Sequence, residues 1–289
     1  MREVLTVYGP VRSWRVGVSL GVDLLCVNSI CSFRCIYCQL GKINIHTLER
    51  RLFVSTARVM RDLRASDWHG ASIVTLSGSG EPTLALNMGE VIREIKSLTN
   101  KPVLVLSNAT MLNDADVRRD IGAADRIFCK LDAADEEGFR KISRPVEGLT
   151  LGSVVAGIRS LRAEYGGHLA IQTMLTPRLV RHHEEFARLI SGIQPDKVQL
   201  NRPSRVVPRD WSLEARGNLP AGSLGGVQLR QVSAEDAARF ERALQDATGV
   251  KTSSAYRLSV GRAAGLRAIH SLRNPPQSPV IFHSRDEPA

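Results

Sequence analysis

The segment Cys31-Ser-Phe-Arg-Cys35-Ile-Tyr-Cys38 places three of the five cysteines within eight residues. Thiolates this close on one loop can hold three corners of an iron–sulfur cube, whose usual complement is four cysteines. No fourth cysteine lies near the motif, so one iron would stay open to a ligand that is not a side chain. The spacing therefore predicts a [4Fe–4S] cluster with incomplete protein ligation.

Two other interpretations of this motif stay open at the level of sequence. The cysteines could form a zinc site completed by His46, or they could pack as small hydrophobic residues. Zinc sites usually pair two CxxC hooks far apart in sequence, and the chain has no second hook. Only Cys26 and Cys129 remain, which is too few for an auxiliary cluster with three or four cysteine ligands.

Length and composition set the broad class of the protein. The chain has 289 residues, of which 43% are hydrophobic and 24% charged, as expected for one α/β barrel-type domain or two small domains. No apolar run approaches the roughly 18 residues of a membrane span, and the N-terminus does not resemble a signal peptide. We therefore expect a cytoplasmic protein with reduced thiols and no membrane partner.

Short β-rich runs alternate with amphipathic stretches between residues 22 and 201, which predicts a parallel sheet with helices outside. The expected strands are Val22–Val27, Ser72–Ser77, Val103–Ser107, Asp125–Asp132, Leu169–Leu175 and Lys197–Asn201. The expected helices are Ser55–Arg64 with Ser55 as N-cap, Met88–Leu98, Asp114–Ile121, Leu151–Tyr165, His182–Ile193 and one from Ser233 to about Ala247. A long loop from Asn28 to about Phe53 carries the cysteines, at the strand ends where such folds collect their chemistry.

Residues 7–25 together with Cys31…Cys38-Gln-Leu-Gly resemble the radical SAM superfamily, in its wyosine-synthetase-like or MoaA/NifB-like branch. The resemblance covers residues 7–205 and implies a partial (β/α)6 TIM-type barrel. Residues 206–289 would form a small, basic, partly irregular C-terminal extension. The resemblance also implies that S-adenosylmethionine (SAM) completes the open iron. The enzyme would then cleave SAM reductively and abstract a hydrogen from its substrate.

Polar residues at the expected strand ends are candidates for binding SAM or substrate. The segment Ser77-Gly-Ser-Gly-Glu-Pro-Thr83 resembles the family's GGEP motif, and its glycines would let the backbone approach a ligand closely. Strand alternation puts Lys130 and Asp132 on one face. An ordinary turn or a surface ion pair is the alternative explanation. The predicted cofactor contacts are Tyr37, Ser77, Gly78, Gly80, Glu81, Pro82, Ser107, Asn108, Lys130, Asp132 and Gln172.

The two remaining cysteines and Lys130 are the candidates for a direct catalytic role. A cysteine can donate hydrogen to a substrate radical in some enzymes that the family includes. Cys26 is the stronger candidate, because alternation turns Cys129 away from the face of Lys130 and Asp132. Both could equally be buried packing residues.

The net charge of +10 bears on the partners of the protein. Between Thr248 and Arg273 there is no acidic residue, and the basic residues there are Lys251, Arg257, Arg262, Arg267 and Arg273. This stretch predicts either an RNA-binding surface or a solvated basic face. The lack of auxiliary clusters favours a small-molecule substrate, such as a sugar, nucleoside or natural-product intermediate, over RNA. A flavodoxin or ferredoxin is the expected electron donor.

Overall fold

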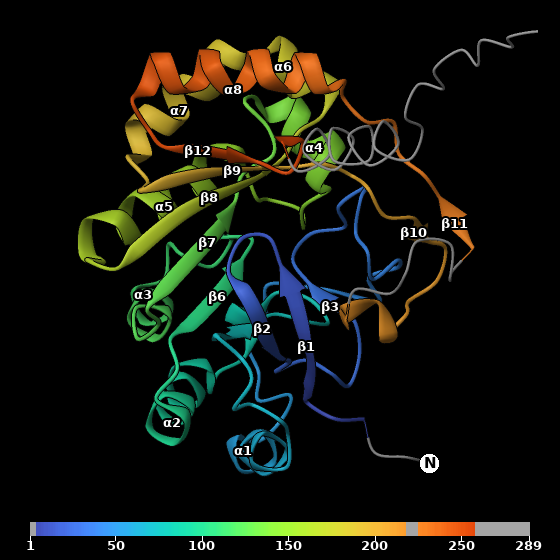
Figure 1. Ribbon diagram of the computed structural model, residues 1–289, viewed down its shortest axis with the longest axis vertical. Coiled ribbons are helices and arrows are strands. Elements are labelled where there is room, and N and C mark those ends of the chain that lie inside the picture. The colour runs from blue at the N-terminus through green and yellow to red at the C-terminus, as the bar shows by residue number, and fades with distance from the viewer. Residues whose placement is uncertain (1–3, 218–224, 258–289) are drawn as a thin grey trace, which may run out of the picture.

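One curved sheet of eight strands organises the molecule, and the computed structural model describes residues 4–217 and 225–257 (Figure 1). Its strand order is β1-β2-β5-β6-β7-β8-β9-β12, and every neighbouring pair except β1 and β2 is parallel. The bounds are Val7–Ser13 (β1), Gly17–Val22 (β2), Ile73–Leu76 (β5), Val103–Ser107 (β6), Arg126–Lys130 (β7), His168–Met174 (β8), Lys197–Asn201 (β9) and Thr252–Ser254 (β12). The sheet curls into a half-barrel, so the predicted partial TIM-type barrel is confirmed.

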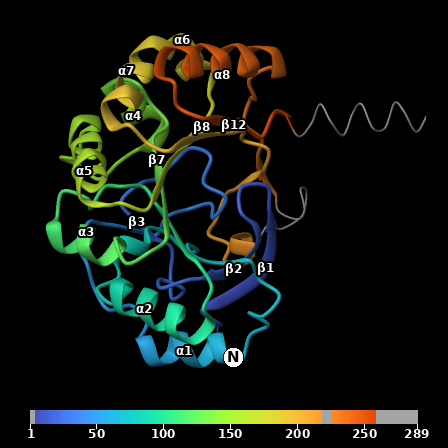
Figure 2. The ribbon, with the colours of Figure 1, turned by 60° about the vertical axis from the view of Figure 1, so that its left-hand side comes forward.

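Helices cover the convex face of the sheet, as the views in Figures 1 and 2 agree. Their bounds are Thr56–Arg64 (α1), Met88–Thr99 (α2), Ala115–Ile121 (α3), Glu136–Ser143 (α4), Leu151–Glu164 (α5), Pro177–Arg181 (α6), His183–Ile193 (α7) and Ala234–Thr248 (α8). The predicted N-cap of α1 is confirmed, because the Ser55 side chain accepts the Arg58 amide. Ser233 caps α8 in the same way, with the amide of Asp236 as donor.

Side chains alternate between two apolar layers along the strands. The larger layer lies between the sheet and the helices and includes Cys129 and Ile171. A smaller cluster of Ile73, Leu104, Phe128 and Ala170 belongs to the opposite, concave face. Lys130 and Gln172 lie on the same face, two residues after Phe128 and Ala170. The concave face therefore turns polar toward the carboxyl ends of the strands.

The structure corrects the first predicted strand, Val22–Val27, which was placed too late in the chain. Strand β2 ends at Val22, and the Leu25 amide donates to Asp23 Oδ1, which closes a turn. Leu24 and Leu25 are buried in this turn. An apolar run with the composition of a buried strand therefore belongs to a core-packed turn.

Other elements were not predicted from the sequence. They include β1, helices α4 and α6, strand β12 and the short parallel pair β3 (Ile30–Cys31) and β4 (Ile45–His46) inside the long cysteine loop. Strand β7 stops at Lys130, so Asp132 lies beyond the strand rather than in it.

The C-terminal part of the chain adds to the barrel. Strand β12 pairs with β9, and α8 packs on α7 with the Phe186 and Phe240 rings 5.9 Å apart. The division between residues 205 and 206 stays a prediction. Arg262, Arg267 and Arg273 of the basic stretch lie outside the described residues. Within the described ranges, no helix is long and apolar enough to cross a membrane.

Candidate active site

Cys31 ends strand β3, Cys35 and Cys38 lie on the loop that follows it, and each of the three is partly exposed. Burial, followed by the charges of Glu81 and Cys35, raises the pKa of Cys31 well above its usual value. Burial and then Cys38 likewise raise the pKa of Cys35, to about 12. The Cys38 amide also donates to the Cys35 carbonyl at 3.1 Å, so these two cysteines share one tight turn.

Two N–H groups already point at the Cys31 sulfur. The Phe33 amide lies 3.4 Å from Sγ, and the Asn108 side-chain nitrogen lies 3.5 Å from it. Hydrogen bonds to ligand sulfurs stabilise the charge of an iron–sulfur cluster and tune its potential. The three thiols with these donors therefore fit a [4Fe–4S] cluster.

The zinc alternative requires His46 to join the cysteines around one ion. His46 Nε2 instead lies 3.1 Å from the backbone oxygen of Ser32. Across the part of the chain that the structure describes, no three His, Cys, Asp or Glu side chains are grouped to hold a single metal ion.

The Ser77–Thr83 turn follows β5 and is hydrogen-bonded directly to the start of the cysteine loop. The Ile30 amide donates to the Ser79 carbonyl at 2.9 Å, and the Glu81 amide donates to the Ile30 carbonyl at 3.0 Å. Gly80 has φ +155°, and a Cβ there would lie 1.6 Å from the Ile30 oxygen. The glycine is therefore required for the two motifs, fifty residues apart in sequence, to pair.

Glu81 ties this turn to the end of β6. Its carboxylate accepts the Thr83 amide and hydroxyl, the Ser107 hydroxyl at 2.8 Å and the Asn108 amide at 2.6 Å. The side chain is 2% exposed, and burial raises its pKa although these donors lower it. Asn108 continues the connection, because its side-chain nitrogen donates to Ser32 Oγ at 2.8 Å.

We expect Glu81→Ala to lower the free energy of unfolding by about 3 kcal/mol, because it leaves buried N–H and O–H donors without an acceptor. Urea unfolding followed by circular dichroism measures the change. Glu90→Ala is the matched control, since that exposed carboxylate accepts only the Thr56 hydroxyl among the hydrogen bonds described here. Equal stability of the two variants would contradict the assigned role of Glu81.

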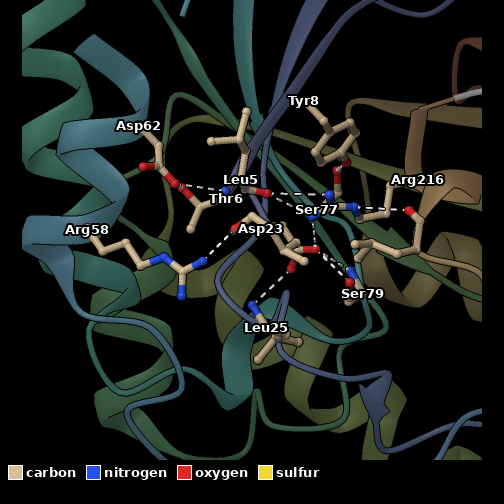
Figure 3. Close-up of polar contacts among 12 residues, drawn as sticks. Leu5, Thr6, Tyr8, Asp23, Leu25, Arg58, Asp62, Ser77, Ser79 and Arg216 are labelled. Carbon is tan, nitrogen blue, oxygen red and sulfur yellow. Dashed lines mark hydrogen bonds and ion pairs between the residues drawn. The ribbon is translucent and has the colours of Figure 1, made fainter. Parts of the chain in front are cut away.

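A buried ion pair supports the same turn from its other side (Figure 3). Asp23 Oδ2 accepts the Ser79 hydroxyl at 2.6 Å and the Arg216 guanidinium at 2.7 Å. Gly78 passes directly over this carboxylate, where a Cβ would meet Asp23 Cγ at 2.4 Å. Ser77 Oγ bonds to the Tyr8 hydroxyl at 2.7 Å, and Arg216 lies over the Tyr8 ring.

Sequence reasoning missed both Asp23 and Arg216. Asp23 follows β2, and Arg216 lies in a short 3-10 helix at Glu214–Gly217, 193 residues later. An acidic residue inside the apolar run from Val22 to Cys26 was the available signal, because a buried carboxylate requires partners.

Lys130, Asp132 and Tyr37 form a second polar group beside the cysteines. The Tyr37 hydroxyl donates to Asp132 Oδ2, and Lys130 Nζ lies 3.4 Å from Asp132 Oδ1. The ammonium also lies 4.8 Å from the centre of the Tyr37 ring. Burial raises the pKa of Cys35 and Cys38, and the Lys130 charge acts in the opposite direction. Lys130 and Asp132 therefore lie together and form an ion pair, and their contact with SAM or substrate stays a prediction.

Gln172 continues this polar face across the sheet. It is the register partner of Lys130 on one side and of Gln199 on the other. Both glutamine side chains are buried, and Gln172 Nε2 and Gln199 Oε1 have no hydrogen-bond partner among the described residues. Buried amides without partners are costly unless a ligand or water satisfies them.

The structure does not bring Cys26 or Cys129 to this group. Cys129 is fully buried in the layer between sheet and helices, on the face opposite Lys130. Cys26 is 2% exposed in the same layer. Burial raises the pKa of its thiol, and Asp23 raises it further. Both cysteines are therefore packing residues in this structure.

The sequence profile of the radical SAM superfamily matches residues 25–190, which contain both motifs and most of the barrel. The chain belongs to the radical SAM superfamily. Membership in this superfamily implies a [4Fe–4S] cluster and SAM as cofactors. The site described above contains residues suited to both.

Sequence relatives lie in the same superfamily branch. A UPF0026 protein of Synechocystis is 43% identical over 249 residues, which cover 84% of this chain and 94% of that protein. A UPF0026 protein of Methanocaldococcus jannaschii is 31% identical over 205 residues, covering 68% and 63%. A probable GTP 3′,8-cyclase of Saccharolobus islandicus is 28% identical over 128 residues, covering 42% and 39%.

Solved radical SAM structures share the fold at low sequence identity. Streptococcus suis SuiB bound to SAM matches with a TM-score of 0.55 and 14% identity. The match covers 81% of this chain, which spans half (50%) of the SuiB chain. An archaeal TYW1 matches with a TM-score of 0.52 and 14% identity, over 81% of this chain and 73% of TYW1.

Proposed function

We propose that this protein is a radical SAM enzyme in which Cys31, Cys35 and Cys38 hold the cluster and the Ser77–Thr83 turn binds SAM. The observation that carries the proposal is the backbone pairing of Ile30 with Ser79 and Glu81. It fixes the cysteine loop against the glycine-containing turn at the carboxyl edge of the half-barrel, where ligands bind in such folds.

When bound, the cluster and SAM supply a one-electron cleavage that leads to hydrogen abstraction from an unactivated C–H bond. The protein residues orient these groups and exclude other reactants. Asn108 and the Phe33 amide donate to the Cys31 sulfur, which stabilises its thiolate form. Glu81 fixes the ends of β5 and β6 relative to each other, so the turn is held before SAM binds.

Tyr37, Asp132 and Lys130 lie beside the cysteines, where they could contact SAM or the substrate. Tyr37 presents an aromatic ring suited to an adenine, and Lys130 supplies a charge that is already paired with Asp132. We propose contact roles for these side chains and for Gln172. No catalytic role is proposed for Cys26 or Cys129, because both are buried in the layer beneath the helices.

The test is anaerobic reconstitution with iron and sulfide, followed by addition of dithionite and SAM. We expect the product 5′-deoxyadenosine, measured by liquid chromatography. If the reconstituted protein showed the visible absorption of a cluster and still released no 5′-deoxyadenosine, with or without a cell extract as substrate source, the enzyme assignment would fail. A reduced flavodoxin or ferredoxin should replace dithionite as the electron donor.

We propose a small polar molecule as the substrate, since the concave face presents side-chain amides and charges rather than a wide basic surface. RNA is the competing substrate class. Arg257, one of the basic residues predicted to bind RNA, instead forms an ion pair with Glu241 at 3.0 Å. A gel shift with bulk tRNA at low and high salt separates the two classes, because binding through phosphates is strongly salt-dependent.

A further inference from the structure

Two arginines meet on the concave side of the half-barrel, close to the cysteine loop. Arg15 comes from the β1–β2 hairpin, and its Nη1 lies 3.2 Å from Asn201 Oδ1 at the end of β9. Arg205 follows β9 and donates to the side-chain oxygen of Gln39, the residue after Cys38. We call Arg15 and Arg205 the arginine pair.

Arg205 follows Asn201, the residue that Arg15 contacts, by four positions, so both cations belong to the same end of β9. Burial first, and then the positive charge of Arg205, lower the pKa of Arg15 to about 10. Burial also lowers the pKa of Arg205. Within residues 4–217 and 225–257, no Asp or Glu forms an ion pair with Arg15. A half-buried cation without a counter-charge is unfavourable, so the fold holds positive charge there that an anion would stabilise.

Two buried amide side chains next to Asn201 each have one polar atom without a partner among the described residues. Asn201, which accepts from Arg15, lies two residues after Gln199 on the same face of β9. Gln199 Oε1 and Gln172 Nε2 are the buried atoms without partners described above. The arginine pair and these two amides therefore form one group, with an excess of hydrogen-bond donors over acceptors.

A donor-rich group of this kind matches a ligand that carries acceptors and negative charge. The planar guanidinium binds carboxylate and phosphate oxygens through two parallel hydrogen bonds. Lys130 cannot supply this recognition alone, because Asp132 already compensates its charge. A neutral ligand would leave the charge of Arg15 uncompensated.

We infer that the substrate carries an oxyanion group, a phosphate or a carboxylate, which binds to Arg15 and Arg205 while Gln172 and Gln199 bind polar groups next to it. This inference rests on the proposed function, because it takes the bound ligand to be the substrate of the enzyme. The oxyanion site itself stands on the arrangement of the four side chains. With its oxyanion group bound there, the rest of the substrate would extend toward Lys130 and the cysteines, since Lys130 and Gln172 are register partners.

Isothermal titration calorimetry of the full-length, cluster-loaded protein tests the site with two probes, inorganic phosphate and acetate, at constant ionic strength. We expect saturable binding of one or both anions, and the tighter one identifies the chemical class. Arg15→Gln and Arg205→Gln should each weaken binding about 10- to 100-fold, the equivalent of losing hydrogen bonds to a charged group. Arg12→Gln is the matched control, because Arg12 is an exposed arginine of the same hairpin.

Arg15→Lys keeps the charge and separates loss of the site from loss of the fold, and it should bind more tightly than Arg15→Gln. Non-saturable heats, or equal affinity for Arg15→Gln and Arg12→Gln, would overturn the inference. Release of 5′-deoxyadenosine is measured separately on the unaltered protein. SAM cleavage without anion binding rejects the oxyanion site alone, whereas Arg15-dependent binding without SAM cleavage rejects the proposed function and leaves the site.

Discussion

Cys35→Ala protein should bind no [4Fe–4S] cluster after anaerobic reconstitution and should release no 5′-deoxyadenosine from SAM. The three cysteines are the whole set of thiols on the loop, so losing one leaves two protein ligands for a cluster that normally has four. Iron and sulfide content per chain, the visible absorption and the product assay measure the loss. The same outcome is expected for Cys31→Ala and Cys38→Ala.

Cys129→Ala is the control for general effects of removing a thiol. Its side chain is fully buried among apolar residues away from the loop, so the variant should keep its cluster and lose only about 1 kcal/mol of stability. Cys26→Ala should behave in the same way. Full cluster content in Cys35→Ala, or its loss in Cys129→Ala, would show that the wrong cysteines have been assigned.

Arg216→Met should lower the free energy of unfolding by about 3–5 kcal/mol, the usual result of removing one partner from a buried ion pair. The Asp23 and Arg216 side chains are only 1% and 8% exposed, and the pair joins residues far apart in sequence. Methionine keeps the apolar contact with Tyr8 while removing the charge. Urea unfolding measures stability, and equilibrium dialysis with SAM tests whether the Ser77–Thr83 turn is disturbed.

Arg239→Met is the matched control, because Arg239 forms its ion pairs on the exposed surface of α8, where they contribute little. The double variant Asp23→Asn, Arg216→Met should be more stable than the sum of the single changes predicts, since neither charge is then left unpaired. Additive effects of the two changes would mean that Asp23 and Arg216 do not depend on each other.

Several elements were predictable because their signals are local. The alternation of β-rich and amphipathic runs predicted strand β6 at Val103–Ser107 and strand β9 at Lys197–Asn201 with the bounds that the structure has. The caps Ser55 and Ser233 were predictable because an N-cap hydrogen bond involves residues only three apart. The strand predicted at Val22–Val27 was wrong, because a buried turn has the same apolar composition as a buried strand.

Some residues of the candidate site were likewise predictable from local sequence, and others were not. The two loop motifs stood out because each is a short run of unusual residues, and Lys130 with Asp132 followed from alternation along one chain segment. The distant partners of Asp23, Glu81 and Arg216 could not be predicted, since they lie from 26 to 193 residues away. Arg15 is a similar case, because its contact with Asn201 spans 186 residues.

The sequence by itself favoured an iron–sulfur cluster over a zinc site, because Cys31, Cys35 and Cys38 lie on one short loop and no second cysteine pair accompanies them. It also determined the fold class through the period of its apolar residues. Only the tertiary structure decided which residues support the site: the pairing of Ile30 with Gly80, the ion pair of Asp23 with Arg216 and the contact of Arg15 with Asn201. These contacts depend on how the sheet curls, which brings distant segments together, and no local pattern of residues encodes that curvature.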